Sequence, residues 1–165
     1  MEQIIVPFLR RIGELWCEKK WGEYQEAVSS QTIRDFLANL RRHFYIPENA
    51  PLVVGSCLPN ERHEIPMQIL LVQCMLRGYR TLMLGPAPAP TAIESTVSLA
   101  SPAIVLLTAS THAVWEDNGE ALQALDAFAK TMPHIKFFIG GAGVKNIVQQ
   151  FELEAIQEAH SLHEV

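Results

Sequence analysis

Residues 52–66 read LVVGSCLPNERHEIP, and this stretch decides the fold. Its first part, residues 52–57, is a short apolar and small-residue run that follows Pro51, which is typical of a buried β-strand. A polar loop comes next, and a helical pattern then runs from Ile65 to a stop near Gly78. A buried strand, a loop and a helix in this order predict the start of a βαβ unit.

The same alternation continues toward the C-terminus. Helical patterns at this spacing between buried strands predict right-handed crossovers and a parallel sheet that is covered on both faces. We therefore predict an α/β fold, Rossmann-like (flavodoxin-like), with a five-stranded parallel sheet and helices on both faces. The further expected strands are 80–85, 103–110, 136–141 and a weak one near Ala155, and the further expected helices are 91–99, 118–130 and 144–151.

The N-terminal part has helical periodicity instead. An apolar stripe at three- and four-residue spacing predicts a first helix, Gly22 marks a break, and a second helix is expected from about Glu23 to Phe44. The stripe consists of Ile4, Ile5, Phe8, Leu9, Ile12, Leu15 and Trp16. We predict a short helical cap (a partial bundle) over residues 1–46, and a Rossmann-like domain over residues 51–165.

Composition excludes several classes of protein. The net charge is −5 and the 13 Lys and Arg residues are scattered, which argues against nucleic acid as the chain's own main partner. No apolar run approaches the roughly 20 residues of a membrane span, and the N-terminus lacks the features of a signal peptide. Three cysteines without a CxxC pair predict neither a disulfide framework nor a zinc site. We expect a cytoplasmic protein with no membrane partner.

The candidate functional residues lie in the loops at the carboxyl ends of the expected strands. Open parallel sheets bind ligands at these ends, and the four loops there are rich in Gly, Pro and small residues. The first loop contains His63, with Glu61 two positions earlier. A neutral imidazole is a good metal ligand, and a nearby carboxylate can accept its other N–H, which fixes the tautomer. His63 is therefore a candidate metal ligand and Glu61 a candidate acceptor, although E-x-H by itself is a weak signal because most loop histidines are solvated.

The spacing of these loops resembles the cobalamin-binding signature. That signature is D/E-x-H-x-x-G, 41 residues, S-x-L, about 26 to 28 residues, and G-G. Here Glu61 and His63 fit its start, Pro66 stands at the glycine position, and 41 residues separate Pro66 from Thr108. The segment 108–110 stands at S-x-L, and 29 more residues lead to a Gly-Gly pair at 140–141.

The resemblance implies a cofactor and its site. In that family the benzimidazole base leaves the cobalt and is buried in a slot beside the first strand, while the histidine takes the lower axial position. Here this implies cobalt ligation by His63, with small residues at the strand ends to admit the nucleotide tail. The implied cofactor-binding residues of this domain are Gly55, Ser56, Glu61, Arg62, His63, Glu64, Ile65, Thr108, Ser110, Gly140 and Gly141.

The residues of the helical cap resemble one branch of these proteins in particular, the light-sensing MerR-type regulators of the CarH/LitR family. Trp16, followed ten positions later by Glu26, is similar to their cap motif. The resemblance implies that Trp16 packs on a 5′-deoxyadenosyl group above the corrin and that Glu26 hydrogen-bonds it. Ala27 departs from the family's histidine, and Cys17 stands where the best-studied branch has a histidine that ligates cobalt after photolysis. The family's cap has four helices and a preceding winged-helix domain, and this sequence shows only two of those helices.

By this resemblance the chain is a sensor module of a transcriptional regulator rather than an enzyme. It would bind adenosylcobalamin base-off and histidine-on, respond to light or cobalamin, and form a homo-oligomer. DNA would be reached only through a separate or missing DNA-binding module. Methylcobalamin and hydroxocobalamin are alternative cofactor forms. The rival functions are a corrinoid carrier subunit of a methyltransferase, which shares the fold and the histidine, and a sensor of another tetrapyrrole such as haem.

Overall fold

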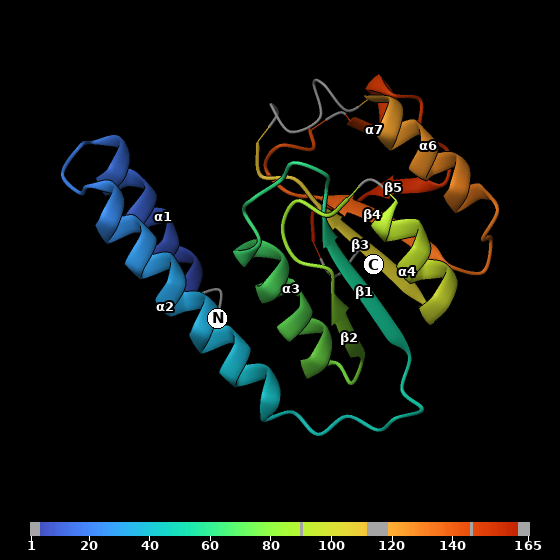
Figure 1. Cartoon of the computed structure of the whole chain (residues 1–165), viewed down its shortest axis with the longest axis horizontal. Helices are drawn as coiled ribbons and strands as arrows, with labels where there is room; N and C mark the ends of the chain where they lie inside the picture. The colour runs from blue at the N-terminus through green and yellow to red at the C-terminus, as the bar shows by residue number, and fades with distance from the viewer. Residues whose placement is uncertain (1–3, 90, 112–118, 146, 162–165) are drawn as a thin grey trace. The chain divides into compact units, whose positions relative to one another are not determined.

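A computed structural model describes residues 4–89, 91–111, 119–145 and 147–161. The chain divides into two compact units, residues 1–45 and residues 46–165. Each unit has its own secondary structure, helices alone in the first and an α/β sheet in the second (Figure 1). None of the helices in the described residues is long and apolar enough to cross a membrane.

The first unit is a helical hairpin. It contains α1 (Ile5–Cys17) and α2 (Glu23–Arg42), which pack against each other. The turn between them includes Lys19 in a left-handed conformation, and the N–H of Gly22 donates to the Gln25 side chain at 2.7 Å at the start of α2. Several large apolar side chains are exposed, among them Phe8, Trp16, Tyr24, Val28 and Phe36.

The second unit is the predicted α/β domain. Its elements follow in the order β1 (Leu52–Cys57), α3 (Ile65–Leu76), β2 (Arg80–Met83), α4 (Ala92–Ala100), β3 (Ile104–Thr108), α6 (Gly119–Lys130), β4 (Lys136–Gly140), α7 (Ile147–Gln150) and β5 (Ile156–Glu158). All neighbouring strands are parallel and their order is β2-β1-β3-β4-β5. This is the flavodoxin-like strand order, and it confirms the predicted fold class.

Strand alternation divides the core between the two faces of the sheet. Leu106 and Phe138 pack with Met67 and Leu71 of α3 on one face. Their sequence neighbours, such as Leu107, point to the opposite face and form the larger core cluster with side chains from α4, α6 and α7. In Figure 1, α3 accordingly lies on one side of the sheet, and α4 and α6 lie on the other.

Two local features differ from or refine the predictions. The helix expected over 144–151 is shorter, because α7 spans only Ile147–Gln150 and turns flank it. Pro66 lies in the first turn of α3, where its missing N–H leaves no helical bond unmade. The start expected for α6 at Asn118 lies outside the described residues.

A buried carboxylate ties α6 to β5. Asp126 accepts hydrogen bonds from the backbone N–H groups of residues 154–156, at distances from 2.9 to 3.2 Å. Burial by itself raises the pKa of Asp126, but these bonds and the nearby Lys130 ammonium outweigh it and hold the pKa below its usual range. The carboxylate thereby places the last strand of the sheet.

Candidate functional site

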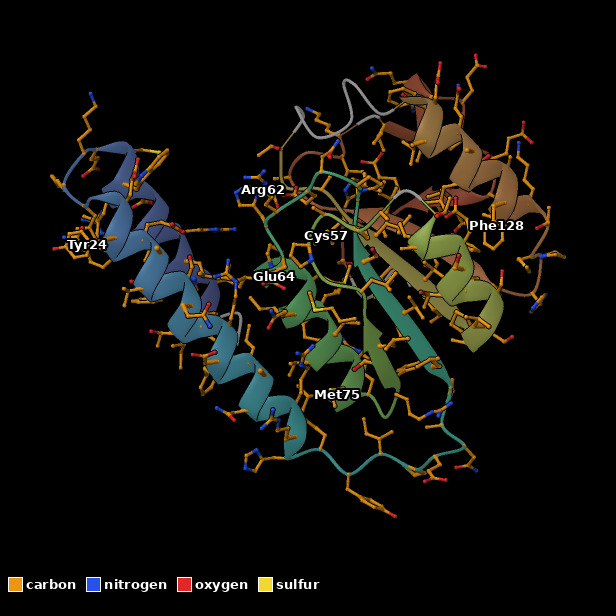
Figure 2. The ribbon with its side chains drawn as sticks, in the orientation of Figure 1. Tyr24, Cys57, Arg62, Glu64, Met75 and Phe128 are labelled. Atoms are coloured by element: carbon orange, nitrogen blue, oxygen red, sulfur yellow. The ribbon has the colours of Figure 1, made fainter. Side chains whose placement is uncertain are left out.

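The site lies where the strand order reverses. β1 neighbours both β2 and β3, so the loops after β1 and β3 leave the sheet side by side. Ligands of open α/β sheets bind in the crevice at this switch point. The loop after β1 carries Glu61 and His63, and the loop after β3 carries Ser110. Cys57, Arg62 and Glu64 are labelled in Figure 2, where this first loop leads from β1 into α3.

Glu61 is the centre of this crevice and is completely buried. One of its oxygens accepts hydrogen bonds from the backbone N–H of His63 and from His63 Nδ1, both at 2.7 Å. Its other oxygen accepts from the backbone N–H of Ser110. The carbonyl of Glu61 accepts from the N–H of Ala87, in the loop after β2, at 2.7 Å. One residue thus joins the loops of three strands.

The pKa of Glu61 reflects this arrangement. Burial by itself raises the pKa, because a charged carboxylate loses its water. The backbone N–H groups of Ser110 and His63 and the His63 side chain outweigh burial and hold the pKa below its ordinary value. Glu61 is therefore ionised near neutral pH and accepts hydrogen bonds at both oxygens.

His63 has the geometry of a metal ligand. Its Nδ1 faces the Glu61 carboxylate, which only accepts hydrogen bonds, so Nδ1 carries the proton and the lone pair is on Nε2. The side chain is 63% exposed, although its carboxylate partner is buried. The imidazole is therefore fixed at one nitrogen and open at the other, which is the arrangement that orients histidine ligands in metal proteins.

Buried neutral groups support the loop from below. The Cys57 thiol, at the end of β1, lies 3.8 Å from the His63 carbonyl oxygen and 3.9 Å from Thr108 Oγ1. Burial raises the pKa of Cys57 to about 11, so it is a thiol and not a thiolate at neutral pH. Asn60, in a left-handed conformation, turns the chain before Glu61. Sequence reasoning did not single out Cys57, because a lone cysteine in a strand gives no functional signal.

The other predicted residues of this domain divide into two groups. Arg62 is exposed and Glu64 is partly buried in the loop itself, whereas Gly55, Ser56 and Ile65 are buried. Gly55 lies under Met67 and Leu71 of α3, and the Ser56 hydroxyl donates to the carbonyl of Cys57. In this structure the small size of Gly55 serves the packing of α3 on β1.

The glycine pair lies at the end of β4, where Gly140 is the last residue of the strand and Gly141 is the next residue. Gly141 has a φ of 119°, and a Cβ there would lie 2.3 Å from the carbonyl oxygen of Ala109. A side chain is excluded for both reasons. Gly141 therefore brings the loop after β4 against the loop after β3, next to Ser110. Residues 112–118 of the third predicted loop lie outside the described residues.

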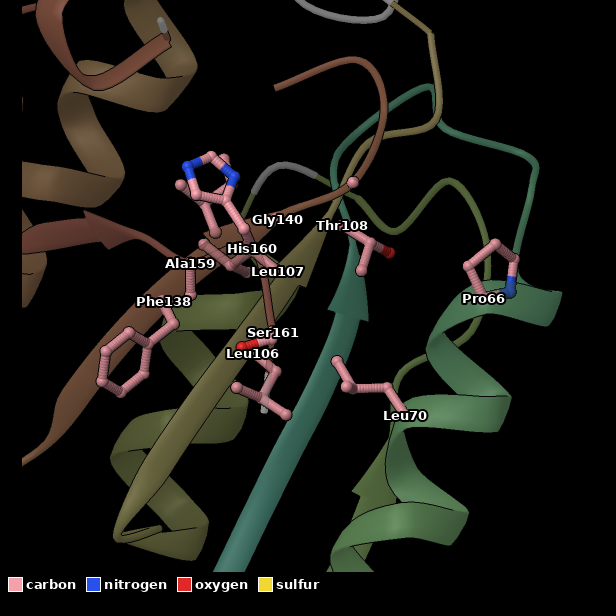
Figure 3. Close-up of a pocket in the computed structure, with 12 residues that line it drawn as sticks. Pro66, Leu70, Leu106, Leu107, Thr108, Phe138, Gly140, Ala159, His160 and Ser161 are labelled. Carbon is pink, nitrogen blue, oxygen red and sulfur yellow. The ribbon is translucent and has the colours of Figure 1, made fainter. Parts of the chain in front are cut away.

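A slot opens beside these loops, and Figure 3 shows it in close-up. It has a volume of about 180 Å³ and lies between α3, the ends of β3 and β4, and the segment after β5. The slot is lined by Pro66, Leu70, Leu106, Leu107, Thr108, Phe138, Ile139, Gly140, Gly141, Ala159, His160 and Ser161. Only Thr108, Gly140 and Gly141 of this lining were among the predicted cofactor-binding residues, since the apolar members are indistinguishable from ordinary core residues in a sequence.

The predicted cap residues lie in the helical unit. Trp16 and Cys17 end α1; both are exposed, and they line a shallow pocket of about 450 Å³ with residues of the following turn. Trp21 belongs to this pocket and was missed, because it lies off the apolar stripe. Glu26, in the first turns of α2, accepts a hydrogen bond from Ser30 Oγ at 2.7 Å.

Within the described residues, no group of three or more His, Cys, Asp and Glu side chains is arranged to hold a metal ion. His63 is thus a single candidate donor, with Nε2 as its open nitrogen. The slot beside it is the right kind of place for part of a cofactor, because it is concave and mostly apolar.

Comparisons with known proteins agree with this fold. No family model matches the chain, and no curated protein sequence matches it. Many solved structures are similar to the chain, and the three described next contain cobalamin or corrinoid proteins.

A cobalamin-binding protein from Desulfitobacterium hafniense DCB-2 is 18% identical with a TM-score of 0.56, over 92% of this chain and 71% of that one. The methanol:cobalamin methyltransferase complex of Methanosarcina barkeri is 18% identical with a TM-score of 0.55, over 91% of this chain and 58% of that one. The monomethylamine corrinoid protein of Methanosarcina barkeri is 15% identical with a TM-score of 0.68, over 94% of this chain and 74% of that one. The chain therefore has the Rossmann-like fold of cobalamin-binding domains.

Proposed function

We propose that this chain binds a corrinoid in its base-off form, with Nε2 of His63 as the lower axial ligand to cobalt. The observation that carries the proposal is the Glu61–His63 pair at the switch point, with one imidazole nitrogen fixed and the other open. A corrin ring supplies four nitrogen donors itself, so a single protein nitrogen completes the lower face. The bound cobalt would hold an exchangeable methyl or adenosyl group on its upper face.

The residues around His63 fit this cofactor. Glu61 would hold the imidazole in place and make Nε2 a stronger donor, because its negative charge faces the Nδ1 proton. The slot lies between α3 and the ends of β3 and β4, and we propose that a nucleotide tail released from the cobalt would enter it there. Gly140 and Gly141 line the slot without side chains, and the backbone carbonyls of Ala159 and Ala109 lie close beside them.

Carriage of a methyl group for a methyltransferase is the role with the better support. Two of the structures with this fold are a methyltransferase complex and a methylamine corrinoid protein. In this role the chain would not perform catalysis alone, and its partner would be an enzyme that delivers or removes the methyl group. A carrier needs an upper face that a partner can reach, so it should not discriminate strongly between upper ligands.

An absorption titration tests both binding and role. Purified protein is mixed with methylcobalamin, adenosylcobalamin and hydroxocobalamin, and each Kd is measured from the change to a base-off, histidine-on spectrum. The carrier proposal expects binding of all three, with similar Kd for the methyl and adenosyl forms. No spectral change with any of them would refute corrinoid binding itself.

A sensor of adenosylcobalamin is the second candidate, and Trp16 favours it. This tryptophan is 51% exposed at the end of α1, next to a shallow pocket, although its size would normally bury it. An exposed aromatic face suits stacking on an adenine ring. In this role, light would cleave the Co–C bond and the loss of the adenosyl group would change the assembly of the chain.

Replacing Trp16 by alanine separates the two roles. The sensor role expects Trp16→Ala to weaken adenosylcobalamin binding about tenfold, because one buried aromatic contact is worth roughly 1–1.5 kcal/mol, with hydroxocobalamin binding unchanged. Tyr24→Ala, at an exposed aromatic residue of α2, is the matched control and should change neither Kd. Equal losses for the two cobalamins in Trp16→Ala would exclude an adenosyl pocket at this residue.

A further inference from the structure

The slot beside the site has an apolar interior. Strand alternation turns Leu106 of β3 and Phe138 of β4 toward the face of the sheet that α3 covers. Leu70 belongs to the same apolar cluster and approaches from α3, one turn after Pro66. Figure 3 shows Pro66 and Leu70 on the helix, across the slot from the strands. The slot is therefore walled by hydrocarbon on its helix side and on its sheet side.

The segment after β5 closes a third side. The N–H of Ala159 donates to the carbonyl of Ile139 at 2.9 Å, so the segment continues the sheet pairing for one residue past β5. Ala159 then packs against the apolar cluster of the α3 face. A Cβ on Gly140 would lie 2.6 Å from the Ala159 carbonyl oxygen, so glycine lets the segment lie directly against the end of β4. The segment after β5 therefore forms the third wall of the slot through backbone contacts with β4.

Polar groups in the lining are few. Thr108, His160 and Ser161 are its polar residues, and Thr108 Oγ1 already points to the Cys57 thiol. His160 and Ser161 enter the lining from the segment after β5, where the chain bends. A flat ring that enters the slot between Leu70 and Leu106 meets mostly hydrocarbon, and the polar side chains of His160 and Ser161 lie on the side formed by the segment after β5.

The size of the slot suits a bicyclic base. An apolar cavity of about 150 Å³ holds a single benzene ring, and this slot has about 180 Å³ and is open on one side. A two-ring base with one edge directed outward therefore fits. Natural corrinoids differ in this base, which is a benzimidazole in some and a purine such as adenine in others.

We propose that this slot selects corrinoids with a benzimidazole lower base over those with a purine, and that Leu70 is a specificity-determining residue. The inference rests on the proposed corrinoid function. The outer ring of dimethylbenzimidazole is hydrocarbon and matches the slot. Adenine carries an exocyclic amine and additional ring nitrogens, which would lose water and find no replacement partners between Leu70, Leu106 and Phe138.

The experiment compares two cofactors that differ only in this base. The Kd of the wild-type protein is measured for adenosylcobalamin and for the same cobamide with adenine as lower base. We expect the benzimidazole form to bind at least tenfold more tightly. The more basic benzimidazole holds the free cofactor's cobalt more strongly, so the cost of releasing the base works against this result. Equal affinities, or tighter binding of the adenine form, would overturn the inference.

Two glutamine variants test whether Leu70 determines the preference between the two bases. Leu70→Gln places an amide in the slot, and should shift the ratio of the two Kd values about tenfold toward the adenine form, since one recovered hydrogen bond is worth about a factor of ten. Leu76→Gln, at an exposed position near the end of the same helix, should leave the ratio unchanged. The strength with which each base holds cobalt in free cofactor cancels in this comparison. If the ratio of the two Kd values is unchanged in a folded Leu70→Gln protein, Leu70 is not a specificity-determining residue.

Cobinamide, which has the same ring and no base, separates failure of this inference from failure of the proposed function. Binding of cobinamide through His63 together with no preference between the two bases would leave the function standing and exclude selection by the slot. No binding of cobinamide or of either cobamide would exclude both. The comparison of bases in the wild-type protein needs no variant, so it decides the inference even if Leu70→Gln does not fold.

Discussion

His63→Ala is expected to abolish base-off, histidine-on binding of cobalamin. The variant removes Nε2, the one nitrogen that the Glu61 carboxylate holds open toward a ligand. The remaining loop has no second imidazole to replace this ligand, since Arg62 is cationic and Glu64 offers only carboxylate oxygens. We expect at least a hundredfold loss of affinity, measured by absorption titration, and any residual complex should keep the base-on spectrum.

Two controls make this result specific. His134→Ala, at an exposed histidine between α6 and β4, should bind as the wild type does. Imidazole added to His63→Ala should restore part of the histidine-on spectrum, because the cavity and the Glu61 acceptor remain. A His63→Ala protein with the wild-type spectrum would show that another group ligates the cobalt, and would refute the assignment.

Glu61→Gln is expected to damage both stability and binding. The carboxylate accepts from three N–H donors with its two oxygens, and an amide has only one oxygen. Its NH₂ group must then face a donor, either at His63 or at the Ser110 backbone. The loss of the charge and the buried donor that it leaves unpaired should lower the free energy of unfolding by about 3 kcal/mol. Urea unfolding should show this loss, and loss of the His63 orienting contact should weaken cobalamin binding about 10- to 100-fold.

The stability difference between wild type and Glu61→Gln should depend on pH. The pKa of Glu61 is lower in the folded protein than in the unfolded chain. Its stabilising contribution is therefore fully present above the ordinary carboxyl pKa, and is lost as the pH falls through the lower pKa of the folded state. The wild type should approach the variant in acid. Glu120→Gln, at an exposed glutamate of α6, should leave the free energy of unfolding at neutral pH close to that of the wild type. A difference that stays constant from neutral to acid pH would contradict the role of the Glu61 charge.

The alternation of strands and helices could be predicted from the sequence, because each strand of a buried parallel sheet is a short apolar run. Residues 52–57 and the runs near 104–108 and 136–140 follow this pattern, and the structure has strands there. The helix expected over 144–151 was too long, because a periodic pattern does not reveal where tertiary packing ends a helix. The change of periodicity at Pro47 predicts a domain boundary there, and the chain divides into two compact units after residue 45.

The sequence by itself determined the fold class and the pairing of Glu61 with His63, because a spacing of two in a strand-end loop brings a carboxylate within reach of its own imidazole. The tertiary structure alone decided what surrounds that pair. The third donor to Glu61 comes from Ser110, 49 residues away, and only the parallel pairing of β1 with β3 brings the two loops together. The slot likewise joins Leu70, Phe138 and Ala159 from three distant segments. In the sequence these are ordinary apolar residues, since burial in a core and burial in a ligand's slot favour the same side chains.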